Sequence, residues 1–411
     1  MLIQEFNSRL FFLHIPKTAG MSLRAFLKDQ FSDDEIFPFQ GWEGVSVDDL
    51  YSLDKKRLVM GHFDARILAF MPADTKTITF LREPIRRTVS ALIHAMSDKE
   101  FCPSGLDVNG RSIEDLIHDE FSMRFFANNQ TGLLSNQGSF ESIRLNVKEK
   151  LINNQLVSSD DITCDIDSAI ENIRNFSFVG IVEQFREDII ALSDKCYLYP
   201  PKDAPLLNAN GKVDSIIRKL GKSELNILKN NNELDIELYS VAREINRGYH
   251  KKSRNEILEN FMKKIPIISD GVNILQSVPF YGWGFNESET SEGNLCRWSG
   301  PSVSSGLNFK VQPDTVYYAN VVAWFYGEPF ATQIVSIYVN NYPVEYNNNE
   351  LLGLVHHRFI FNSNSSGNIE LELVCNQVAT TSEDKRSRGF IVSAISVSKA
   401  ECMLNPFTEK T

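Results

Sequence analysis

The chain lacks the features of secreted, membrane-spanning and polyanion-coating proteins. Its 411 residues include only 6 cysteines, which form no C-x-x-C pair and no dense framework, so we expect reduced thiols and no metal site. No apolar run approaches the length needed to cross a bilayer. The first residues show no basic stretch followed by an apolar run, so no signal peptide is expected. With 42 lysines and arginines against 53 acidic residues, the net charge is -11. We therefore expect a cytoplasmic protein with no transmembrane segment and no nucleic-acid partner.

A chain of this length exceeds what one hydrophobic core usually serves, so two domains are expected. Up to about residue 267, short apolar runs alternate with helical periodicity, which is typical of α/β layering. The runs at 10–15, 57–60, 77–81 and 176–181 are predicted to be strands, and a long charged helix is predicted around 233–264. We assign residues 1–267 to this α/β domain.

Beyond residue 268 the apolar residues alternate with period two, and turn-forming clusters separate the alternating runs. Three such runs occupy residues 307–311, 335–339 and 369–373. Short strands at this spacing predict an all-β sandwich over residues 268–411. The sequence gives no prediction of the oligomeric state.

One candidate anion site follows the first predicted strand. A tight turn and a helix start there contain Pro16, Lys17, Thr18, Ala19, Gly20, Met21 and Ser22. Backbone N–H groups and the positive helix end would face an anion, and Lys17 adds a charge at the same place. The turn lacks the first glycine and the Gly-Lys-Ser/Thr ending of a Walker A loop, so a metal-dependent NTPase is not favoured. An ordinary strand-to-helix turn with an exposed lysine remains the alternative.

A second candidate anion site follows the strand at 77–81. Arg82 stands at the end of that strand, Pro84 suits the first turn of a helix, and Ser90 lies about two turns further along. A guanidinium and a hydroxyl could hold a second phosphate. We interpret Arg86 as a surface charge. Together the two sites indicate a nucleotide with phosphates at both ends.

These two segments resemble the 5′-phosphosulfate and 3′-phosphate motifs of sulfotransferases. The motif His-Ile-Pro-Lys-Thr, followed by Leu-Arg-Glu-Pro, most resembles the heparan-sulfate 2-O/6-O sulfotransferase-like branch and its bacterial relatives. The resemblance covers about residues 8–250. It implies a P-loop NTPase-like parallel sheet flanked by helices. It also implies 3′-phosphoadenosine 5′-phosphosulfate (PAPS) as the sulfuryl donor and a hydroxyl of a glycan or glycan precursor as the acceptor, with no metal required.

The resemblance also implies roles for single residues. His62, after a glycine at the end of the second strand, would be the general base, and Lys17 would stabilise the leaving phosphosulfate oxygen. Arg124 would contact the nucleotide. Met21 stands where the family usually has threonine, so Ser22 or Thr18 would have to supply the missing hydroxyl.

Several alternatives stay open at this point. The acceptor could be a small-molecule alcohol or a peptide tyrosine, the α/β half could be a degenerate P-loop kinase, or the protein could be a non-catalytic carbohydrate-binding protein. The second domain resembles a β-sandwich appended to bacterial glycan-building enzymes, with a carbohydrate-binding or assembly role. Its tryptophans, Trp283, Trp298 and Trp324, could stack on sugars, but we favour packing in the sandwich core.

Overall fold

The structure of the chain is a computed structural model that divides into two compact units. The first consists of Met1–Arg24, Asp33–Leu198 and Leu206–Ser253, and the second of Ala25–Ser32, Tyr199–Pro205 and Arg254–Thr411. The residues that the structure describes are 9–98, 102, 105–136, 138–153, 155, 157, 164–203, 211–276, 279–291, 294–300, 302–324, 333–351, 353–378 and 388–400. Among these residues, no helix has both the length and the apolar surface to cross a membrane.

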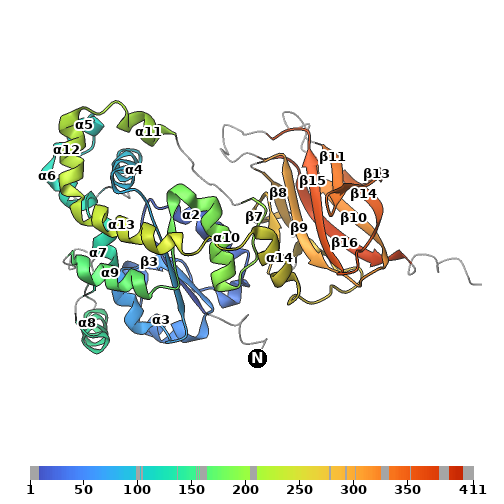
Figure 1. The fold of residues 1–411 in the computed structure, drawn as a ribbon, viewed down its shortest axis with the longest axis horizontal. Helices are drawn as coiled ribbons and strands as arrows, with labels where there is room; N and C mark the ends of the chain where they lie inside the picture. The colour runs from blue at the N-terminus through green and yellow to red at the C-terminus, as the bar shows by residue number, and fades with distance from the viewer. Residues whose placement is uncertain are drawn as a thin grey trace, which may run out of the picture. The chain divides into compact units, whose positions relative to one another are not determined.

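The first unit contains a parallel sheet with the strand order β2-β3-β1-β4-β5. Its strands, blue to green in Figure 1, alternate along the chain with helices. The strands are β1 (Leu10–Leu13), β2 (Gln40–Gly41), β3 (Leu58–His62), β4 (Lys76–Leu81) and β5 (Phe178–Ile181). The helices are α2 (Gly20–Lys28), whose residues from 25 on belong to the second unit, α3 (Val47–Ser52), α4 (Pro84–Ser97), α5 (Ile113–Ile117), α6 (Glu120–Phe126), α7 (Asn129–Leu134), α8 (Phe140–Ile152), α9 (Ile166–Asn175), α10 (Phe185–Cys196), α11 (Lys212–Ile217), α12 (Lys222–Asn231) and α13 (Glu233–Arg247).

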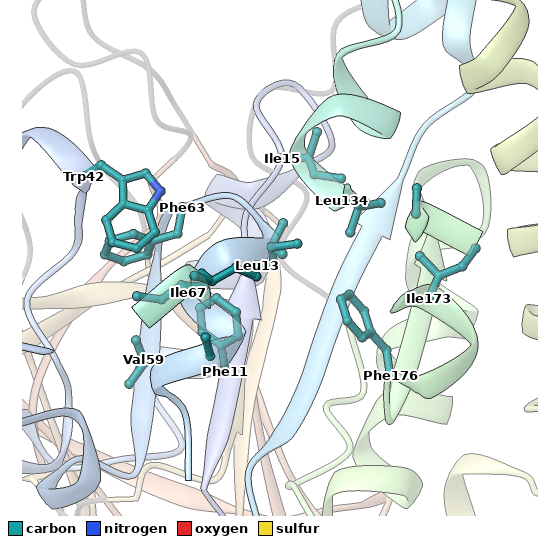
Figure 2. Close-up of a cluster of buried hydrophobic side chains, with 14 of the residues drawn as sticks. Phe11, Leu13, Ile15, Trp42, Val59, Phe63, Ile67, Leu134, Ile173 and Phe176 are labelled. Carbon is teal, nitrogen blue, oxygen red and sulfur yellow. The ribbon is translucent and has the colours of Figure 1, made fainter. Parts of the chain in front are cut away.

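Continuous apolar strands build this sheet because both of its faces are covered. All four residues of β1 are buried, as are those of β5, which is the usual pattern of a parallel strand between helical layers. On one face, Phe11 and Leu13 pack with Val59 from the neighbouring strand, as Figure 2 shows. The four predicted strands are thus confirmed, with bounds that shift by one or two residues at an end.

The predicted long helix over 233–264 is wrong in its continuity. The structure has α13, which ends at Arg247, and then a separate helix, α14 (Arg254–Met262). Gly248 caps the end of α13. Glycine is a poor residue for a helix interior, because it gives up the most backbone freedom there, so the charged periodicity is interrupted at this point.

The second unit contains α14 and two antiparallel sheets, with the strand orders β13-β14-β10-β16-β8-β7 and β12-β11-β15-β9-β6. Leu307 and Leu371 from one sheet share a core with Tyr317 and Val392 from the other, so the sheets form the predicted β-sandwich. The strands, yellow to red in Figure 1, are β6 (Gly282–Trp283), β7 (Phe285–Ser291), β8 (Asn294–Ser299), β9 (Ser304–Lys310), β10 (Val316–Trp324), β11 (Ile334–Val339), β12 (Tyr342–Pro343), β13 (Tyr346–Leu351), β14 (Leu354–Asn362), β15 (Asn368–Cys375) and β16 (Ile391–Lys399).

The second unit takes in more of the chain than the segment 268–411. Tyr199 donates its phenolic O–H to Asn308 of β9, and its backbone N–H to the side chain of Gln30. Arg297 of β8 forms an ion pair with Asp29 at 2.9 Å. Residues from both halves of the sequence therefore complete this unit, whereas the periodicity alone placed a single boundary near residue 268.

Candidate active site

The site residues of the first unit gather where three parallel strands end. The last residue of β1, Leu13, pairs with Gly61 of β3 on one side and with Thr79 of β4 on the other. The segments after these pairs hold the loop from His14 to Ala19, His62 and Arg82. The carboxyl edge of a parallel sheet is where open α/β folds bind their ligands.

The loop between β1 and α2 has an unusual backbone. Lys17 and Ala19 both have left-handed conformations, with φ angles of 72° and 61°, and Thr18 between them does not. Side chains with a Cβ avoid this region, so such strain is kept only where the surroundings require it. Alternating backbone hand turns consecutive N–H groups towards one concave side, which makes an anion-binding nest. The Thr18 hydroxyl donates to the Ile15 carbonyl at 2.8 Å and so closes the turn.

Two cations lie at this loop. The guanidinium of Arg82 donates to the carbonyl oxygen of Lys17 at 3.3 Å. Burial lowers the pKa of Lys17, and the charges of Arg82 and Arg87 lower it further. The Nε–H of Arg82 is buried and has no hydrogen-bond partner in the described part of the chain. Two neighbouring cations, together with a buried N–H group that has no acceptor, are the arrangement expected of a site that binds an anion.

The backbone of Arg82 is held in place by one amide side chain. Gln130 accepts from the N–H of Arg82 at 2.9 Å and donates to its carbonyl at 3.0 Å. Gln130 belongs to α7, whose first N–H groups, from Gln130 and Thr131, donate to the buried carboxylate of Asp235 in α13. This chain of contacts fixes the end of β4 to two helices.

Arg87 is a buried residue that holds the loop from His14 to Ala19, which we call the cradle loop. Its guanidinium donates to the carbonyls of Pro16 at 3.2 Å and Phe126 at 2.7 Å, and to the side chain of Asn129. Burial lowers the pKa of Arg87 to about 10, although the negative charge of Asp235 acts to raise it. Arg87 therefore connects the loop after β1 to α6 and α7. Its neighbour Arg86 is half-exposed and forms an ion pair with Asp214 at 3.1 Å, as expected for a surface charge.

His62, the expected general base, lies at the same edge of the sheet. It is the last residue of β3, its side chain is exposed, and its Nδ1 lies 3.3 Å from the carbonyl oxygen of His14. Because a carbonyl only accepts, Nδ1 carries the proton and Nε2 keeps the lone pair. Removal of water from part of the ring lowers the pKa of His62, and the charge of Arg24 lowers it further, whereas the hydrogen bond to His14 raises it. The imidazole is therefore neutral at pH 7.

The remaining predicted residues are less closely joined. Ser90 lies half-buried on α4, and Arg124 is exposed on α6; among the described residues, no hydrogen bond or ion pair connects Arg124 to the cradle. Met21 is 49% exposed, whereas Ser22 and Thr18 are buried. Neither of these two hydroxyls thus lies at the surface position where Met21 replaces the threonine of the resembled family.

The candidate site residues taken from the sequence do not include four residues that shape the site. They are His14, Arg87, Gln130 and Asp235, whose contacts reach the cradle loop, His62 or one another from three helices and the segment after β1. Arg87 and His14 stand inside the two motifs, so their position was a usable signal. Gln130 and Asp235 lie 105 residues apart, and no local pattern predicts their contact. In the described part of the chain, no group of three His, Cys, Asp or Glu side chains could hold a metal ion.

The second unit has an open groove of about 310 Å³ beside α14. Neutral amides make up much of its wall, including Asn255, Asn308, Asn340, Asn341 and Asn368. None of the three sandwich tryptophans lines it. Trp283 and Trp298 are instead buried in the unit, at 4% and 6% exposed, and Trp324 packs against Trp298. The preferred interpretation of the first two as packing residues is confirmed.

Comparisons with known proteins give only distant likenesses. No protein-family model matches the chain, and no curated protein matches its sequence. Among solved structures, it is similar to a family 35 carbohydrate-binding module from Clostridium thermocellum, with 16% identity and a TM-score of 0.22 over 30% of this chain and 93% of that one. It is also similar to an exo-beta-1,3-galactanase from Phanerochaete chrysosporium, with 13% identity and a TM-score of 0.22 over 32% of this chain and 29% of that one. Likenesses this weak establish neither the fold nor the function of the chain.

Proposed function

We propose that the protein is a PAPS-dependent sulfotransferase. The observation that carries the proposal is that Lys17 and Arg82 converge at the strained loop after β1, on the same sheet edge as the neutral His62. Burial lowers the pKa values of both Lys17 and Arg82, and a bound anion beside them would favour their charged forms. A base beside that anion site fits transfer of a group to a hydroxyl.

In the proposed reaction, the loop from Pro16 to Ser22 holds the 5′-phosphosulfate of PAPS, and Arg82 and Ser90 hold the 3′-phosphate. Nε2 of His62 accepts the proton of the acceptor hydroxyl, whose oxygen then bonds to sulfur. The bond between sulfur and the 5′-phosphate oxygen breaks, and adenosine 3′,5′-bisphosphate leaves. Lys17 balances the negative charge that grows on the departing oxygen.

For the acceptor we propose a hydroxyl of a glycan or glycan precursor, in line with the sequence resemblance. The acceptor oxygen has to approach within hydrogen-bond distance of Nε2 of His62, and the exposure of that residue leaves the approach open. In the second unit, the groove beside α14, lined by asparagine amides together with Glu259 and Glu370, offers donors and acceptors suited to sugar hydroxyls.

Isothermal titration calorimetry tests the assignment without knowledge of the acceptor. Adenosine 3′,5′-bisphosphate should bind in the presence of EDTA, and much more tightly than AMP, because only the former has a phosphate for Arg82 and Ser90. Charge-assisted hydrogen bonds contribute roughly 1.5–3 kcal/mol each. Equal affinity for the two nucleotides would remove the sulfotransferase assignment. A strict requirement for Mg²⁺ with ATP would instead favour the kinase alternative.

A further inference from the structure

His62 does not stand alone at the end of its strand but lies on a stack of rings. Its imidazole is stacked on that of His14, with ring centroids 4.4 Å apart and planes 29° apart. His14 is stacked in turn on Phe12, at 5.2 Å and 25°. Phe39 meets His62 edge-on at 5.2 Å. His62 thus contacts two rings, that of His14 just after β1 and that of Phe39 just before β2.

The ring of His14 is held firmly although it is not satisfied as a polar group. The residue is 5% exposed, and its Nδ1 is buried with no hydrogen-bond partner in the described part of the chain. Gly20, the first residue of α2, lies against the opposite edge of the ring, where even a methyl group would overlap it. An unsatisfied buried nitrogen is costly, so packing alone would favour an apolar ring at this position. A role for His14 therefore has to rest on the contacts of its ring with neighbouring rings, and not on a hydrogen bond of its Nδ1.

We propose that His14 is a positioning residue for His62: its ring is a fixed platform, and its carbonyl is the acceptor, that together hold the His62 imidazole with Nε2 towards the acceptor hydroxyl. The role in turnover rests on the proposed function, whereas the orientation of His62 does not. The backbone carbonyl sets which nitrogen carries the proton, and the stacked ring sets the plane in which that nitrogen lies.

The electrostatics of the pair agree with this role. Burial is the main cause that lowers the pKa of His14 well below its usual value, and the charges of His62, Arg24 and Lys17 add to it. The charged groups that face His62 are Arg24 of α2 and, only if it were protonated, His14. A platform that stays neutral leaves His62 free to become the single imidazolium during turnover. Two protonated rings 4.4 Å apart would repel each other.

Paired substitutions of His14 test the proposal in the full-length protein. His14→Ala removes the platform and lets water reach the His62 ring, so kcat should fall by about 10- to 100-fold, the scale of a misplaced catalytic group. The KM for PAPS should change little, and the acid limb of the pH–rate profile should move up towards the ordinary histidine value. His14→Phe keeps a flat ring and should retain most of the activity and the original acid limb. Equal losses of kcat in the two variants, with no shift of the acid limb of the pH–rate profile, would show that His14 only packs and does not position His62.

A measurement on the wild-type protein keeps the test independent of how well the variants fold. Nitrogen-15 NMR of the imidazole groups, without any ligand, should show His62 as the Nδ1–H tautomer and His14 as neutral across the range in which His62 titrates. A His62 ring protonated at Nε2, or one that exchanges freely between tautomers, would overturn the proposal. Because this readout needs no turnover, it can succeed even if the sulfotransferase assignment fails, so the two failures remain distinguishable.

Discussion

Gly20 lies directly against the imidazole of His14, so that a Cβ at residue 20 would overlap Nε2, Cδ2 and Cε1 of that ring. Gly20 begins α2, and His14 is the first residue after β1. The start of the helix that forms the anion cradle is thereby coupled to the ring that supports His62. A side chain added at residue 20 should therefore affect nucleotide binding and the base together.

Gly20→Ala should displace the His14 ring or the start of α2. We expect weaker binding of adenosine 3′,5′-bisphosphate, lower turnover and reduced stability, because the methyl group has no space. Gly211→Ala is the matched control, since a Cβ at Gly211 meets nothing within 4 Å. Calorimetry, turnover and thermal unfolding of both variants check this. If Gly20→Ala behaved like the control, the close contact with His14 would be unimportant.

Lys17→Met should separate binding from stability. Burial and the charges of Arg82 and Arg87 disfavour the charged form of Lys17 and lower its pKa, so without this charge the nucleotide-free protein should unfold at the same or a slightly higher temperature. Affinity for adenosine 3′,5′-bisphosphate should fall roughly 10- to 100-fold, the loss of one charge-assisted contact. Arg86→Met, on α4, removes a half-exposed charge instead and should leave affinity unchanged. Comparable losses of affinity in the two variants would show that Lys17 attracts the nucleotide only at long range, as any surface cation would, and makes no direct contact with it.

His62→Ala should lower turnover by about 10²–10⁴-fold, the usual effect of losing a general base, with nearly unchanged nucleotide affinity. The wild-type rate depends on neutral His62, so it should be constant above the pKa of this group and fall as the pH drops through it. Since that pKa is lowered, the fall should occur below the ordinary value of about 6.5.

Arg24→Gln removes a charge that contributes to the lowering of the His62 pKa, and it should therefore move the acid limb of the pH–rate profile to higher pH. A pH-independent rate, or a limb that stays in place in this variant, would place the base elsewhere.

Arg87→Met should strongly destabilise the first unit. It would leave the carbonyls of Pro16 and Phe126 and the side chain of Asn129 without their donor, and the buried Asp235 without its neighbouring charge. A buried acceptor left without its donor costs roughly 1–3 kcal/mol. Arg86→Met should cost at most about 1 kcal/mol, as for exposed ion pairs. Urea unfolding compares them; similar midpoints for both variants would contradict the role of Arg87 in holding the cradle loop.

The sequence by itself determined four strands of the first unit, three of the second, the two architectures and the residues at the sheet edge. Apolar runs such as 10–13 and 178–181 can only be buried on both faces, and period-two alternation such as that of 369–373 fits a sheet with one buried face, so local pattern is enough to identify both. Strand ends followed by Lys17, His62 and Arg82 meet at one edge because parallel strands point the same way. Those positions needed no knowledge of distant contacts.

Only the tertiary structure decided how these residues are held. The contacts of Gln130 with Arg82, of Asp235 with Thr131, and of Tyr199 with Asn308 join residues 48 to 109 positions apart, and no period in the sequence encodes such pairs. The unit boundary also depends on them, which is why residues 25–32 and 199–205 belong to the second unit. The stack of His14 on His62 has the same origin: local pattern places each ring at a strand end, but only the pairing of β1 with β3 brings one ring onto the other.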